Sequence, residues 1–368
     1  MSGELEEDDE PWWLREDQPE DEGDLEPPGI ILPRRKATAE PADDHPLLMP
    51  LAQAQDAVAR LEASAAAASP AIIEGLRARM AYREAAGWLA HGHTWIHPRD
   101  LALRDARLTS SYGAAASAGR LAAALPAMAA QGAVFDVVPS DQVIGTALRL
   151  AQLWRRLAEF RTWAPLKDAT TVREALKPLA WGGTLDNADI DDWLGGLRGR
   201  GQIPVLIRAG RTARDWMNRH TESADPLTLD GLFLAACVWR EDGFGRDIAL
   251  PFWVAPSALH HRLALRVGVD WMAGFLECVA RAAQIGLEEL NRLRRAETMI
   301  ADLGGTARSR LRDAADRVIR APVITARSLA DGLDVSPQAA LGLLRQLLAA
   351  GIVREATGRA AWRAFVVA

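Results

Sequence analysis

Cysteine is scarce in this 368-residue chain, which contains only Cys237 and Cys278. This scarcity excludes a disulfide framework and a zinc module built from several cysteines, and both thiols are expected to be buried in the core. No run of about 18 uncharged apolar residues occurs, and the acidic N-terminus lacks the basic and apolar regions of a signal peptide. These absences predict a cytoplasmic protein with no membrane partner.

Lysine is also rare, and charge is distributed unevenly. Of the 43 basic residues 40 are arginine, a general bias that does not by itself indicate phosphate binding. The formal net charge is −6, yet residues 1–47 carry a net charge of −12 and residues 306–368 a net charge of +5. A basic C-terminal module is therefore expected in a chain whose overall charge is acidic.

Residues 1–47 combine acidic runs with seven prolines. Such a segment cannot bury enough apolar surface to offset the entropy of ordering it, so it is expected to be disordered. Three roles stay open for this segment. It can keep the protein in solution, carry a short docking motif around Trp12 and Trp13, or mimic nucleic acid and cover the basic module.

Residues 48–305 have the spacing of a helical body. Apolar residues three and four apart begin at Leu51, Ala54, Val58 and Leu61, and residues 63–68 are rich in alanine. Further helices are expected over residues 71–89, 101–107, 114–130, 141–160, 172–179, 190–197, 205–219, 227–238, 256–267 and 271–299. The predicted fold class is mainly α, with a break at Gly304-Gly305 before a separate domain at residues 306–368.

The C-terminal domain begins with the pattern of a helix-turn-helix. Thr325 is expected to cap a short helix, and Asp334 and Val335 to form the turn after it. Ser336 then caps a second helix with Pro337 at its first position, where a missing N–H costs nothing. The inner faces of the two helices are expected to contain Leu329, Leu333, Ala340, Leu344, Leu347 and Leu348.

After Gly351, a good left-handed helix cap, the apolar period changes to two. Two strands are expected within residues 352–355 and 362–366, joined by a turn around Arg359. A helix-turn-helix followed by a hairpin predicts a winged helix whose second helix enters the DNA major groove. The expected contacts are Ser336, Gln338, Ala339 and Arg345 to base edges, and Arg327, Arg359 and Arg363 to the backbone.

The second helix carries a single arginine, so its own electrostatic attraction to DNA is weak. Double-stranded DNA is the expected partner, and a homodimer is expected to supply the remaining affinity. Winged helices also dock proteins without touching nucleic acid. A protein-interaction module is therefore an open alternative.

Residues 323–366 are similar to the winged helix that closes many bacterial Fic-type proteins. Upstream, Leu250-Pro251-Phe252-Trp253 followed by a helix led by Trp271 resembles the leucine-proline-aromatic pattern of that family. Taken whole, the chain resembles a rhizobial, alphaproteobacterial family of helix-turn-helix proteins that join a domain of unknown function to this C-terminal domain. The resemblance implies a Fic-like helical body.

Active Fic proteins transfer a nucleotide monophosphate to a hydroxyl side chain. Their motif is His-Pro-Phe, two residues, then Gly-Asn-Gly-Arg, in which the histidine is the base and the glycine-rich loop holds phosphates. This chain has only His220 in the matching neighbourhood and lacks the loop. The resemblance therefore implies a body without catalysis or cofactor. The alternative is a residual nucleotidyl transferase of a toxin-antitoxin type system.

One histidine cluster has a spacing that merits comparison with metal sites. His91, His93 and His97 precede Asp100, and these side-chain types ligate zinc in other proteins. The spacing matches no known site closely, so we expect capping and hydrogen-bonding histidines and no metal. Together the observations predict a mainly α DNA-binding protein that acts as a transcriptional or plasmid-maintenance regulator.

Overall fold

Almost all regular structure in the described part of the chain is helical. A computed structural model describes residues 45–106, 141–159, 162–179, 186–198, 203–219, 227–241, 243, 247–303, 310–356 and 363–368. Its elements in order are α1 (Leu48–Ala66), α2 (Pro70–His91), α3 (Pro98–Asp105), α5 (Asp141–Glu159), α6 (Ala169–Leu176), the 3-10 helix η2 (Lys177–Leu179), α7 (Asn187–Arg198), α8 (Val205–Arg219), α9 (Leu229–Glu241), α10 (Ser257–Ala264), α11 (Gly268–Ala301), α12 (Leu311–Arg320), β1 (Ile324–Thr325), α13 (Ala326–Leu333), α14 (Pro337–Ala349), β2 (Val353–Glu355) and β3 (Ala364–Val367).

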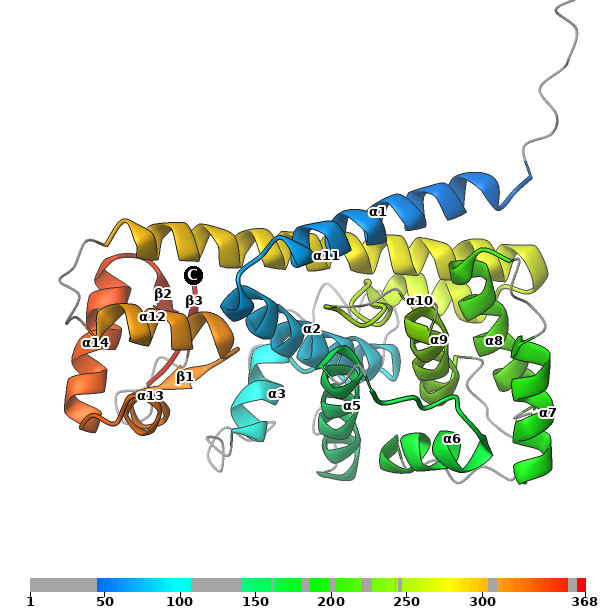
Figure 1. Ribbon diagram of the computed structural model, residues 1–368, viewed down its shortest axis with the longest axis horizontal. Coiled ribbons are helices and arrows are strands. Elements are labelled where there is room, and N and C mark those ends of the chain that lie inside the picture. The colour runs from blue at the N-terminus through cyan, green and yellow to red at the C-terminus, as the bar shows by residue number, and fades with distance from the viewer. Residues whose placement is uncertain are drawn as a thin grey trace, which may run out of the picture. The chain divides into compact units, whose positions relative to one another are not determined.

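The 34-residue helix α11 organises residues 45–368, which form one compact unit. Helix α1 packs along α11, and α2 packs against α11, α5 and α12 (Figure 1). Helices α7 and α8 lie toward the N-terminal end of α11, and α12 to α14 lie at its C-terminal end (Figure 1). We call α1 to α11 the helical body and α12 to β3 the C-terminal module.

The mainly α fold class is confirmed. Most expected helices are present with ends shifted by a few residues, because helix ends depend on caps that the apolar period does not encode. Residues 1–44, the expected helix at 114–130 and the expected break at Gly304-Gly305 lie outside the described residues. None of the described helices has both the length and the apolar character of a membrane span.

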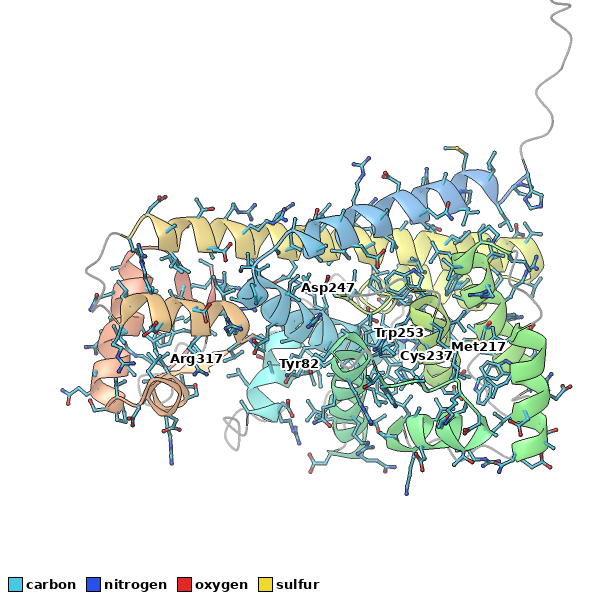
Figure 2. The ribbon with its side chains drawn as sticks, in the orientation of Figure 1. Tyr82, Met217, Cys237, Asp247, Trp253 and Arg317 are labelled. Atoms are coloured by element: carbon cyan, nitrogen blue, oxygen red, sulfur yellow. The ribbon has the colours of Figure 1, made fainter. Side chains whose placement is uncertain are left out.

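Large aromatic side chains fill the core of the helical body. Trp253, Cys237 and Met217 lie in its packed interior (Figure 2), and Trp216 donates a hydrogen bond of 2.7 Å from Nε1 to Asp230 Oδ2. Cys237 and Cys278 are both buried, as expected. Burial raises the pKa of each thiol, to about 12 for Cys278, which keeps both protonated at neutral pH.

Two buried titratable groups bracket the loop before α10. Glu84 on α2 accepts hydrogen bonds from the backbone N–H of Phe252 at 2.9 Å and of Trp253 at 2.7 Å. His260 on α10 has Nε2 3.2 Å from the carbonyl oxygen of Phe252. Burial raises the pKa of Glu84 to about 8 and lowers the pKa of His260 to about 4.

These two pKa shifts predict how stability varies with pH. Glu84 keeps a proton in the folded chain that the unfolded chain releases, so the free energy of unfolding falls as pH rises from 4.5 to about 8. The unfolded chain protonates His260 where the folded chain does not, so the same free energy falls as pH drops from 6.5 to about 4. Between pH 4.5 and 6.5 the two contributions oppose each other.

Above pH 6.5 only the Glu84 contribution of this pair remains. We expect the free energy of unfolding in urea to fall by about 2 kcal/mol between pH 6.5 and pH 8. The Glu84→Gln variant serves as the control, because it removes the titrating group and should flatten the profile. Equal stability of the wild-type protein at both pH values would contradict this prediction.

Candidate nucleic-acid interface

The C-terminal module has the element order helix, strand, helix, helix, strand, strand. Its three antiparallel strands lie in the order β1-β3-β2, with Ile324 opposite Phe365 and Val353 opposite Val367. Strands β2 and β3 fall where the sequence pattern predicts strands, whereas β1 was not predicted. A two-residue strand is too short to show an apolar period, so only its pairing with β3 in the folded chain defines it as a strand.

Side-chain hydrogen bonds fix the start of α13, and a backbone hydrogen bond closes its end. Thr325 Oγ1 accepts a bond of 3.1 Å from the N–H of Ser328, and the N–H of Thr325 donates one of 2.9 Å to Ser328 Oγ. Asp334 has φ +53°, and the N–H of Val335 closes the turn on the carbonyl of Ala330 at 3.1 Å. The predicted cap and turn are confirmed.

Helix α14 begins as the sequence predicts. Pro337 is its first residue, and Ser336 Oγ accepts a hydrogen bond of 3.2 Å from the N–H of Ala339. Beyond its end, Gly351 has φ +71°, a left-handed conformation that costs glycine little. Local sequence thus determines where α14 begins and where the chain leaves it.

The inner face of α14 is narrower than predicted. Ala340, Leu344 and Leu347 are buried, but Leu348 is 38% exposed. Leu348 follows Leu347 directly and so points about 100° away around the helix, past the edge of the core. The prediction that Leu348 is buried was wrong.

The opposite face of α14 is exposed and polar. Gln338 and Ala339 are exposed on its first turn beside the cap residue Ser336, and Arg345 is exposed about 10 Å further along the axis. This face offers an amide, a hydroxyl and a guanidinium. These groups can bond the donors and acceptors at base edges.

The arginines expected to contact the DNA backbone differ in their exposure and in their ion pairs. Arg327 is exposed on α13, and in the described part of the chain neither Arg327 nor Arg345 forms an ion pair. Arg363, just before β3, is 39% exposed and lies 3.9 Å from Glu355. Arg359 lies outside the described residues. Arg327 is thus the backbone cation with the clearest support.

Two other arginines of the module have structural partners. Arg317 donates to the carbonyl of Gly332 at 2.9 Å and so joins α12 to α13. Arg320 bonds Asp316 at 2.7 Å and Glu74 of α2 at 2.6 Å. The net charge of the module therefore overstates the positive charge that it offers to DNA.

A buried arginine of the helical body holds the end of α12. Arg79 on α2 is 6% exposed and donates to the carbonyl oxygens of Ile319 at 2.6 Å, Ala321 at 2.7 Å and Val318 at 3.2 Å. These carbonyls have no partner within α12 because the helix ends there. Sequence reasoning missed Arg79, since no local pattern links it to residues some 240 positions away.

The histidine cluster has capping and packing roles. His97 Nδ1 accepts a hydrogen bond of 3.1 Å from the N–H of Arg99 and caps α3, as expected. The rings of His91 and His93 lie 4.9 Å and 5.0 Å from the ring of His261. Among the described residues no group of three or more side chains is placed to hold a metal ion. His220 lies outside those residues.

Residues 311–367 match the family model described as an HTH DNA-binding domain, and no curated protein matches the chain. The C-terminal module therefore contains a helix-turn-helix and is similar to domains that bind DNA. In this domain α13 and α14 are the helices on either side of the turn at Asp334, and α14 carries the exposed polar face. The match covers none of the helical body, so the resemblance of residues 48–305 to Fic-type proteins stays a prediction.

Proposed function

We propose that this protein is a sequence-specific DNA-binding regulator of transcription or plasmid maintenance. The observation that carries the proposal is the exposed polar face of α14 within a matched helix-turn-helix domain. Ser336, Gln338, Ala339 and Arg345 read base edges from this face, and Arg327 contacts the phosphate backbone. Strands β2 and β3 form the wing of a winged helix.

The helical body is proposed to act as a dimerisation or ligand-sensing part and not as an enzyme. The Fic-type resemblance supports a helical scaffold that lacks the phosphate-binding loop. A homodimer places two α14 helices on two half-sites, which compensates for the single arginine on each helix. The proposed partner is double-stranded DNA, and the proposed location of the protein is the cytoplasm.

The test is selection of bound duplexes from a random pool by the full-length protein at two salt concentrations. Gln338→Ala and Arg345→Ala should each relax the preference for one base, at roughly 1 to 3 kcal/mol per lost contact. Arg327→Ala should weaken all duplexes about equally and lower the salt dependence, because its phosphate contact carries no sequence information. A dimer predicts a palindromic motif.

The matched control is Arg211→Ala. Arg211 is exposed on α8, which lies near the opposite end of α11 from the helix-turn-helix domain (Figure 1). This variant should keep the affinity and the base preference of the wild-type protein. Unchanged base preference in both α14 variants would overturn the assignment of α14 as the reading helix.

A further inference from the structure

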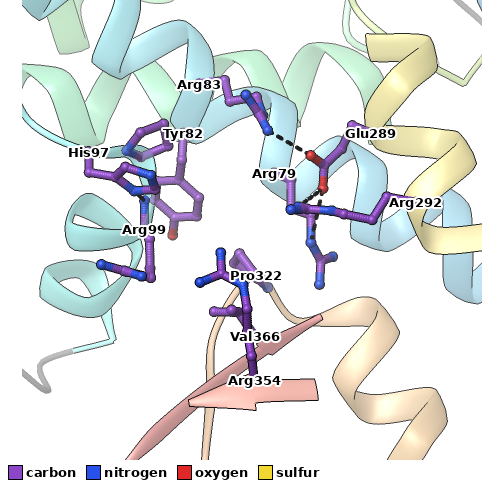
Figure 3. Close-up of a pocket in the computed structure, with 11 residues that line it drawn as sticks. Arg79, Tyr82, Arg83, His97, Arg99, Glu289, Arg292, Pro322, Arg354 and Val366 are labelled. Carbon is purple, nitrogen blue, oxygen red and sulfur yellow. Dashed lines mark hydrogen bonds and ion pairs between the residues drawn. The ribbon is translucent and has the colours of Figure 1, made fainter. Parts of the chain in front are cut away.

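A pocket of about 150 Å³ lies where the helical body meets the helix-turn-helix domain (Figure 3). Its walls come from α2, the start of α3, α11 and the strands β2 and β3. Five arginines line it, namely Arg79 and Arg83 of α2, Arg99 of α3, Arg292 of α11 and Arg354 of β2. This gathering of like charges at one small cavity is unfavourable unless anions neutralise it.

The described residues supply only part of that neutralisation. Glu289 on α11 is buried and bonds Arg83 at 2.8 Å and Arg292 at 2.5 Å. Burial alone would raise the pKa of Glu289, but the surrounding arginines hold that pKa below its ordinary value, so Glu289 is ionised. Glu289 is the only carboxylate among the described residues that line the pocket. Asp100, 3.6 Å from Arg99, and Asp105, which accepts a hydrogen bond from Tyr82, lie outside that lining. Five guanidinium groups are therefore set against three nearby carboxylates in the described part of the chain.

Two of the arginines have a buried donor that makes no hydrogen bond. These donors are Nε of Arg99, which lies 3.6 Å from Asp100 Oδ1, and Nε of Arg292. Arg354 is exposed and forms no ion pair within the described part of the chain. In Figure 3 Arg354 rises from β2 toward the space between Arg99 and Arg292. Donors from α3, α11 and β2 therefore converge on one cavity.

We propose that this pocket binds a small anion that carries a phosphate group. Guanidinium groups bind phosphate through paired N–H donors, and several of them around one cavity match the oxygens of a phosphate dianion. The volume is below that of pockets for drug-sized ligands, so it suits a phosphate monoester with few carbons better than a nucleotide.

The position of the pocket gives its occupant a regulatory role, which rests on the proposed function. An anion held jointly by Arg99, Arg292 and Arg354 joins α3 and α11 of the body to β2 of the DNA-binding domain. If DNA requires one placement of that domain, the anion and DNA alter each other's affinity by the same factor. The site is thus that of an effector and is separate from the exposed face of α14.

The binding test is calorimetric titration of the full-length protein with glycerol 3-phosphate, inorganic phosphate and citrate, each at constant ionic strength set with sodium chloride. We expect saturable binding of one glycerol 3-phosphate per chain. Arg99→Gln and Arg354→Gln should each weaken this binding at least tenfold. Arg295→Gln is the matched control, because Arg295 is exposed on α11 and does not line the pocket.

Thermal melts without ligand show whether each variant is folded. Substitution of the exposed Arg354 should not lower the melting temperature, because it removes a like charge from the cluster. Absence of saturable binding, or equal weakening by Arg295→Gln, overturns the site. Citrate binding more tightly than both phosphate ligands overturns the ligand class.

Duplex titrations without phosphate separate the site from DNA contact. If Arg99→Gln and Arg354→Gln lower duplex affinity as much as they lower phosphate affinity, the pocket contacts the DNA backbone and the proposal is wrong. Phosphate binding by a wild-type protein that binds no duplex would overturn the proposed function and leave the site intact. Duplex binding without phosphate binding would overturn the phosphate site and leave the proposed function intact.

Discussion

Replacing Arg79 by methionine is expected to lower the free energy of unfolding by about 3 to 5 kcal/mol. Methionine preserves much of the volume but removes the donors that bond the carbonyls of Val318, Ile319 and Ala321 at the end of α12. A buried carbonyl without a partner bears its full desolvation cost. Glu289, 3.5 Å from Arg79, also loses one of its neutralising charges.

Burial lowers the pKa of Arg79 to about 10, so the guanidinium is still charged at neutral pH and all of these bonds are charge-assisted. The measurement is urea denaturation, followed by hydrogen exchange on the same variant. Amides of α12 should exchange faster in Arg79→Met, because the end of this helix has lost its hydrogen bonds to Arg79. Amides of α9 should exchange only through global unfolding, so their protection should fall only by the loss in global stability.

Arg83→Met provides the control for this substitution. Arg83 bonds the same Glu289 but is 35% exposed, and it donates no hydrogen bond to α12 among the described residues. Because Glu289 keeps Arg79 and Arg292, the expected loss is at most about 1 kcal/mol. Equal losses in the two variants would mean that the ion pairs of Glu289, and not the carbonyls of α12, account for the effect of Arg79.

The features that could be predicted from the sequence are those encoded within one or two turns of chain. The caps at Thr325 and Ser336 and the turn at Asp334 depend on neighbours at most five residues away. Their side-chain types are strongly selective for those positions, which is why the helix-turn-helix was recognisable. The exposed residues Gln338 and Arg345 follow from the same helical period.

The arginine pocket could not be predicted in this way. Its arginines lie at positions 79, 83, 99, 292 and 354, and 40 of the 43 basic residues are arginine, so none of the five differs from the background. They come together only through the packing of α2 against α3 and α11, and of β3 against α11 and β2. The prediction that Leu348 is buried was wrong for a related reason. A helical period gives the direction of a side chain but not the width of the surface that covers it.

Replacing Gly75 by alanine is expected to destabilise the protein by about 3 kcal/mol, the opposite sign to the usual effect of this change within a helix. Gly75 lies in α2, where alanine ordinarily stabilises by about 1 kcal/mol. Here an added Cβ would lie 2.1 Å from the carbonyl oxygen of Ile319 and 2.7 Å from Nη1 of Arg79. Both distances are far inside van der Waals contact, so α12 must move away from α2.

Gly195→Ala is the matched control for this sign. Gly195 lies within α7 and has no atom within 4 Å of an added Cβ, so alanine there should stabilise by up to about 1 kcal/mol.

The double variant Gly75→Ala with Arg79→Met tests whether the two residues act together. Its loss in the free energy of unfolding should be smaller than the sum of the two single losses, because both changes act on one contact with Ile319. Additive losses would show that Gly75 and Arg79 hold α12 independently. A less-than-additive loss would show that Gly75 and Arg79 act on α12 through this one contact, beside the separate ion pair of Arg320 with Glu74.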